Sequence, residues 1–296
     1  MTDSGHVRTD GSGGDRSQND ADHRLPLFWR ISAVFVAVTV IWLIIQYVSR
    51  ATFGADYNRT GHVVSAVLAT VLTVPVVALA RRAFDRRPWA GLGLSPLRSG
   101  WRSFLIGTAC YLLPAAVGLT AVVALGWVEI TLETSLGELL WLVVSLMILV
   151  FLYEALPEEL VFRGYLYRNL ATAFPQRLAV GGQAVLFTLW AVAIGAAPTV
   201  ERVVIFLAVA AVLGMIRAIT GDVWACIGFH VAFQTVQQLF AGGWAGDVFV
   251  VTNPGTLELI AFGIVPFALS LAVLELFVET ETDWDEPEVV DEGPIE

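Results

Sequence analysis

The chain has 296 residues, of which 56% are hydrophobic and 15% are charged, and its formal net charge is −10. Soluble domains are about 45–50% apolar and about 25% charged, so this composition excludes an ordinary soluble enzyme and favours a polytopic membrane protein. The two cysteines, Cys110 and Cys226, lie inside apolar runs, which excludes a disulfide framework and a cysteine zinc cluster. All 17 basic residues are arginines without a cluster on a soluble face, so we expect no nucleic-acid partner.

Composition divides the chain into three parts. Residues 1–26 are polar and rich in Gly, Ser and Asp, which predicts a disordered N-terminal tail. Residues 27–278 form a predicted transmembrane helical domain in which 139–240 is the predicted catalytic core. Residues 279–296 carry nine acids and no base, which favours a solvated acidic tail over a tail that binds a partner.

Charge-free apolar runs predict the membrane spans. A bilayer core of about 30 Å needs about 20 apolar residues in a helix. Eight runs approach this length, so we predict an all-α protein with about eight transmembrane helices in contact with the lipid bilayer. The runs are 31–48, 63–80, 103–128, 139–153, 178–200, 203–216, 223–246 and 259–274.

The placement of the arginines tests this count and orients the chain. Loops on the cytoplasmic side carry the excess of basic residues. With the N-terminus inside, 14 arginines fall in cytoplasmic segments and 3 outside, and the two classes alternate through all eight spans. The sequence therefore predicts a multi-pass protein of the cell membrane with both termini in the cytoplasm. The three outside arginines are Arg50, Arg59 and Arg202.

Three glutamates follow the charge-free run 139–153 of the fourth predicted span: Glu154, Glu158 and Glu159. A charge at the bilayer centre costs about 2.5–3.5 kcal/mol, so such residues favour a functional reading. Glu159 and Arg163 are four residues apart and can pair on one helix face, which leaves Glu158 free. The alternative is a span end with ordinary interfacial acids. Three acids and an arginine directly after an apolar helix favour instead a carboxylate in a dry pocket that acts as a general base.

The seventh predicted span carries the only histidine deep in an apolar run, His230. Cys226, His230 and Gln234 are spaced by four and so line one face of a helix. A packing role for the histidine stays open, but the amide one turn away favours a site. Cys226 is expected to pack as a small apolar side chain.

At these two segments the chain resembles the CPBP family of CAAX-prenyl-protease and bacteriocin-processing intramembrane metalloproteases, also called Abi. The family pattern is Glu-Glu-x-x-x-Arg, then Phe-x-x-x-His, then His-x-x-x-Asn. Glu158-Glu159-Leu-Val-Phe-Arg163-Gly matches the first part, and His230 with Gln234 in place of Asn matches the third. The second part departs from the pattern, because Ala191 stands where Phe187 leads to a histidine in the family. The resemblance covers about residues 139–240.

The resemblance implies roles for these residues. Glu158 would activate a water, Glu159 with Arg163 would orient the helix, and His230 with Gln234 would face the scissile carbonyl. It also implies a divalent metal such as zinc, for which Glu158 and His230 are the tentative ligands. A catalytic zinc has three protein ligands, and Gln234 is a poor third. Of the other histidines only His62, in the second predicted span, could substitute.

Three hypotheses follow. The first is an intramembrane endopeptidase that cleaves a membrane peptide or protein. The second is a catalytically impaired relative that serves as a membrane scaffold or immunity factor, because Ala191 replaces the histidine. The third is a proton pathway through the glutamates and His230, which the absence of an inverted repeat in the sequence disfavours. The substrate and the oligomeric state stay open.

Overall fold

A computed structural model describes residues 25–241, 244, 248–279 and 282–288. Most of the predicted N-terminal tail and the end of the acidic tail lie outside the described residues. The described chain is almost entirely helical, which confirms the predicted all-α polytopic class. Its eight long helical segments correspond one to one with the predicted apolar runs. They are α2 (Leu27–Phe53), α3 with η1 (Arg59–Ala80 and Arg81–Asp85), α4 (Leu97–Ala124), α5 to α7 (Leu136–Ala171), α8 (Gln176–Ala193), α9 (Val200–Thr220), α10 (Val223–Phe240) and α11 to α12 (Pro254–Glu275).

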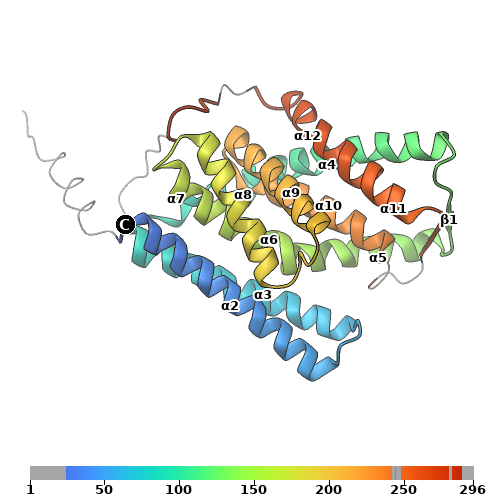
Figure 1. The fold of residues 1–296 in the computed structure, drawn as a ribbon, viewed down its shortest axis with the longest axis horizontal. Coiled ribbons are helices and arrows are strands. Elements are labelled where there is room, and N and C mark those ends of the chain that lie inside the picture. Colours follow the sequence, from blue (N-terminus) through green and yellow to red (C-terminus); the bar gives the residue numbers. More distant parts are fainter. Residues whose placement is uncertain (1–24, 242–243, 245–247, 280–281, 289–296) are drawn as a thin grey trace, which may run out of the picture.

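Six of the eight segments are long and apolar enough to cross a membrane. The remaining two, α8 and α10, have 18 residues each (Figure 1). Most of α10 is buried among other helices, whereas α8 buries one face and exposes the other. The polar side chains Gln183, His230 and Gln234 of these two helices are buried or half-buried, where they find protein partners.

The helices of the bundle run between two ends (Figure 1). At the end that we call the arginine end, α2, α4 and α10 begin and α3 ends. There Arg30 Nη1 donates to Asp85 Oδ1 at 2.9 Å, and Trp224 Nε1 donates to the Ser95 carbonyl at 2.8 Å. At the opposite end, which we call the ribbon end, β1 (Ile130–Leu132) pairs antiparallel with β2 (Phe249–Val251).

The fourth helical segment is longer than predicted. It continues without interruption from Leu136 to Ala171, over 36 residues, and so extends well beyond the charge-free run 139–153. The glutamates therefore lie in the interior of a helix. Around the glutamates the backbone hydrogen-bond pattern changes. Two π-helical segments, η3 (Phe151–Ala155) and η4 (Leu160–Leu166), flank a single α-helical turn, α6 (Leu156–Glu159). π-turns of this kind are frequent at functional sites.

Proline explains one part of this irregularity. In η3 the Leu156 N–H donates to the Phe151 carbonyl, five residues earlier. The next donor in that register is Pro157, which has no N–H. The Leu152 carbonyl receives the Thr70 hydroxyl of α3 instead, so this buried carbonyl is satisfied from a neighbouring helix.

Two glycines set the position of α10. A Cβ atom built on Gly107 of α4 would lie 1.8 Å from the Ala225 carbonyl oxygen, and one on Gly228 would lie 2.0 Å from the Phe104 carbonyl oxygen. Only glycine at both positions lets the two backbones approach so closely, as small residues do between membrane helices. This contact fixes the height of His230, two residues after Gly228.

The described part of the acidic tail packs against the bundle. Arg168 Nη1 lies 2.9 Å from Glu288 Oε1, and the Glu288 N–H donates to the Ala171 carbonyl at 2.8 Å. The Gln176 N–H donates to the Glu286 carbonyl at 3.2 Å. Residues 284–288 thus contact the junction of α7 (Tyr167–Ala171) and α8, which a freely solvated tail would not do.

Candidate active site

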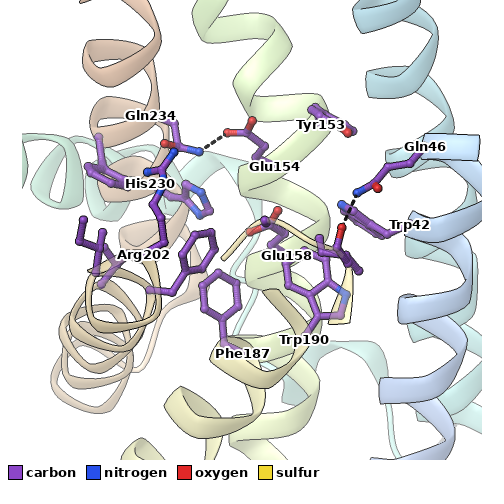
Figure 2. A pocket seen from close by; sticks show the side chains of 16 residues that line it. Trp42, Gln46, Tyr153, Glu154, Glu158, Phe187, Trp190, Arg202, His230 and Gln234 are labelled. Atoms are coloured by element: carbon purple, nitrogen blue, oxygen red, sulfur yellow. Dashed lines mark hydrogen bonds between the residues drawn. The ribbon is translucent and has the colours of Figure 1, made fainter. Parts of the chain in front are cut away.

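A pocket of about 340 Å³ lies between α2, η3, α6, α8, α9 and α10 (Figure 2). Its wall combines carboxylates, a histidine and an amide with large aromatic rings. This is the composition expected of a binding site with a few convergent polar groups in an apolar surround. The lining residues used below are Trp42, Gln46, Tyr153, Glu154, Glu158, Trp190, Ala196, Arg202, His230 and Gln234.

Glu158 is the unpartnered carboxylate of the pocket. It is 8% exposed and lines the cavity, and no hydrogen bond to it is found among the described residues. One helical turn earlier, Glu154 accepts hydrogen bonds from Gln234 Nε2 at 2.7 Å and from Gln238 Nε2 at 2.9 Å. The two carboxylates therefore differ: amides hold Glu154 in place, and Glu158 keeps both oxygens available for a water or a substrate.

Glu159 does not line the pocket and is held by two partners at one oxygen, whereas its buried Oε2 has no hydrogen-bond partner among the described residues. Its Oε1 atom lies 3.0 Å from Arg163 Nη1 and 2.7 Å from His230 Nδ1, and both Glu159 and Arg163 are fully buried. The predicted pairing of Glu159 with Arg163 is confirmed. The Arg163 guanidinium also lies over the Phe187 ring, 4.6 Å from its centroid. Buried charges of this kind need such partners, because the desolvation cost is otherwise too large.

The contact with Glu159 defines the state of His230. A hydrogen bond from Nδ1–H to a carboxylate fixes the ring orientation and assigns the proton to Nδ1. The other ring atom, Nε2, has no partner among the described residues, and the side chain lines the pocket. His230 thus connects the buried Glu159–Arg163 pair to the cavity that contains Glu158.

The predicted residues accordingly separate into two groups. Glu158, His230 and Gln234 line the pocket (Figure 2), whereas Glu159 and Arg163 lie behind it. The hydrogen bond from Gln234 Nε2 to Glu154 holds the Gln234 side chain at the pocket wall.

Ala191, at the position of the missing histidine, packs in the apolar core. It is fully buried and does not line the pocket. Its neighbour Trp190 does line it, and the buried indole Nε1 has no hydrogen-bond partner in the described structure. His62 does not replace the missing residue. It contacts Tyr57 and the Tyr153 ring at the ribbon end and is not part of the pocket wall.

A metal at this site would have too few ligands. Within the described residues no group of three or more His, Cys, Asp and Glu side chains could hold an ion. The two tentative ligands, Glu158 and His230, line one cavity and supply only two of the three protein donors that a catalytic zinc needs. This donor set does not fit a zinc site with three protein ligands, and no step below depends on a metal.

Sequence reasoning missed several residues of the pocket. Glu154 was singled out only as one of three glutamates, and its partner Gln238, which lies outside the pocket wall, could have been found because the four-residue spacing Gln234–Gln238 places two amides on one face. Trp190 and Arg202 carried no such signal. An apolar helix places many aromatics in its core, and an arginine at a span boundary is ordinarily a topology signal.

Comparison with known proteins supports the family resemblance. Residues 139–236 match the family model described as type II CAAX prenyl endopeptidase Rce1-like. This segment runs from α5 through α10 and contains Glu158, Glu159, Arg163, His230 and Gln234. The match confirms the predicted CPBP resemblance over this segment, about a third of the chain, and together with the six apolar helices it indicates a multi-pass membrane protein. No curated protein and no solved structure matches the chain.

Proposed function

We propose that the protein is an intramembrane endopeptidase that hydrolyses a peptide bond of a membrane-associated substrate. The observation that carries this proposal is the position of Glu158: an unpartnered carboxylate beside His230 in a pocket inside the helical bundle. A general base must reach the water that it activates while the rest of the site excludes competing solvent. The Rce1-like segment supports the same reaction class.

The reaction needs one water and one proton carrier. Glu158 takes a proton from the water, whose oxygen attacks the scissile carbonyl carbon. The carbon–nitrogen bond then breaks, and Glu158 returns the proton to the leaving amine. The products are a new carboxylate terminus and a free amine, so no further reactant is required.

The tetrahedral intermediate carries an oxyanion that needs hydrogen-bond donors aimed at it. Two side chains of the pocket wall carry candidate donors: Trp190, whose buried Nε1–H has no partner in the described structure, and His230, whose Nε2 is not engaged and donates when the ring is doubly protonated. Glu159 orients the His230 ring through the Nδ1 contact of 2.7 Å. Glu159 and Arg163 are positioning residues in this scheme, because they act through His230 and the helix backbone.

A second candidate function rests on Ala191. Because a packed alanine replaces the histidine of the second motif, the protein could be a catalytically impaired relative that acts as a membrane scaffold or immunity factor. This alternative predicts that replacing Glu158 leaves the cellular phenotype unchanged.

A cleavage assay with three purified forms separates the two functions. Wild type, Glu158→Gln and the control Glu133→Gln are incubated in detergent with a membrane-peptide library, and products are read by mass spectrometry. Glu133 is an exposed carboxylate next to β1, so its substitution should have no effect. We expect Glu158→Gln to lower the rate by about 10²–10⁴, the range for loss of a general base. Equal cleavage by Glu158→Gln and wild type would refute the assigned role, and folded but inactive wild type would favour the scaffold.

A further inference from the structure

The residues that line the pocket come from one half of the bundle. Trp42 and Gln46 lie in the second half of α2, which begins at the arginine end. Arg202 lies in the first turn of α9, which ends at the arginine end. Ala196 follows the end of α8. All four positions are therefore displaced towards the ribbon end.

Exposure of the lining residues shows where the mouth of this pocket is. Arg202 is exposed, and Gln46 and Ala196 are half-buried, whereas Glu158 and His230 are buried. Gln46 Nε2 donates to the Ile194 carbonyl at 3.2 Å and holds α2 against the end of α8 at the rim (Figure 2). The accessible rim thus faces the ribbon end, and the carboxylate lies at the inner end of the cavity.

On the other side of Glu158, buried side chains fill the bundle. Arg217 is 1% exposed and lies between two backbone carbonyls. Its Nε donates to the Arg163 carbonyl oxygen at 3.2 Å, and its Nη2 lies 3.5 Å from the Leu92 carbonyl oxygen. Closer to the arginine end, Asp85 is contacted by Arg30, Arg81, Tyr165 and Asn169. Together these two groups of buried polar side chains, which we call the polar network, lie between the carboxylates and the arginine end.

The arginine distribution relates these two ends to the membrane. Eleven of the 14 arginines in the described part of the chain fall in segments that belong to the arginine end, and the positive-inside rule places such segments in the cytoplasm. Both the pocket rim and Arg202, one of the three remaining arginines, would then face the opposite side. The two observations are independent, because one concerns a cavity and the other concerns loop charge.

We propose that the pocket is entered from the extracytoplasmic side of the membrane, so that its substrates are membrane-bound peptides displayed on that side. The substrate part of this inference rests on the proposed proteolysis, and the entry side does not. A peptide segment anchored in the outer leaflet would reach Glu158 past Arg202 and Ala196 without crossing the polar network.

Cysteine labelling tests the entry side without requiring activity. The two native cysteines, which are both fully buried, are replaced by alanine, and single cysteines are introduced by Ala196→Cys, Glu133→Cys and Ala83→Cys. Ala196 reports the pocket, Glu133 the ribbon end and Ala83 the arginine end. Intact cells are treated with a membrane-impermeant maleimide before and after permeabilisation. Gln46→Cys is a second pocket position in case Ala196→Cys does not fold.

We expect the Ala196→Cys and Glu133→Cys proteins to be labelled in intact cells, and the Ala83→Cys protein only after permeabilisation. Labelling of the pocket cysteine only after permeabilisation would overturn the proposal, whether or not the Glu133→Cys protein follows it. Failure to label a folded pocket variant under either condition would overturn it too. An inactive protein with an externally labelled pocket would count against proteolysis alone and would support the entry side.

Discussion

Glu158 and Glu159 are adjacent in the sequence, yet they belong to two different regions of the molecule. Glu158 has no hydrogen-bond partner in the described structure and faces a pocket. Glu159 is bonded to Arg163 and His230 in a region without exposure. The same helical turn thus places one carboxylate at the pocket and the other in a buried ion pair. Loss of the first should affect chemistry, and disruption of the second should affect stability.

The largest expected effect tests the buried region. Arg163→Met leaves the Glu159 carboxylate buried with only His230 as a partner. Breaking a buried ion pair by removing one partner costs about 3–5 kcal/mol, because the remaining charge is uncompensated. We expect a loss of this size in the free energy of unfolding, measured by denaturant titration in mixed micelles.

The double variant Glu159→Met/Arg163→Met is the control for this prediction. It removes both charges, so it should be less destabilised than Arg163→Met alone. If the two variants unfold at the same denaturant concentration, the Glu159–Arg163 contact is not the source of the loss, and the contrast between the two glutamates fails.

The next effect tests the pocket. Trp190→Phe keeps an aromatic ring but removes the unpartnered Nε1–H. Loss of one oxyanion donor costs about 10²–10³ in kcat, with little change in KM. Trp42→Phe is the matched control, since its indole lines the same pocket and its ring centroid lies 5.3 Å from that of Trp190. Equal losses in the two variants would assign both indoles to packing.

The sequence predicted the bundle well, because membrane spans depend on a strong signal. Long apolar runs and alternating arginines gave eight helices in the correct order. The Glu159–Arg163 pair was also predictable, because two side chains four residues apart on a helix must share a face.

Other features depended on contacts between distant segments, which a single sequence does not specify. The hydrogen bond from His230 to Glu159 joins α10 to α6 across 71 residues. The Thr70 hydroxyl, from a third helix, donates to the Leu152 carbonyl that Pro157 leaves without a backbone donor. The glutamates were expected at a span end because acids usually terminate apolar helices. Here partners on α10 keep them inside the bundle, so tertiary contacts decided the outcome.

A smaller effect concerns the site of the missing histidine. Ala191 is fully buried within the core, so Ala191→His must place an imidazole where no space is available. Overpacking of this kind costs about 1–3 kcal/mol, and we expect a lower midpoint of thermal unfolding and no gain in cleavage. Ala193→His, at an exposed position of the same helix, is the control and should unfold like wild type. A stable Ala191→His protein with increased activity would instead mean that the pocket can still accept the family's histidine.

The smallest effect concerns the rim of the pocket. Arg202 is exposed, lines the cavity and has no ion-pair partner among the described residues, so it is available to an acidic group on a substrate. An exposed ion pair contributes about 0.2–1 kcal/mol. Arg202→Gln should therefore raise KM for acidic peptides by a factor of about five or less and leave kcat unchanged. Arg50→Gln, an exposed arginine in the last turn of α2 that does not line the pocket, is the control. If neutral peptides lose as much as acidic ones, Arg202 shapes the rim rather than selecting charge, and the contrast between a reactive pocket and a structural interior rests on Glu158 and Trp190 alone.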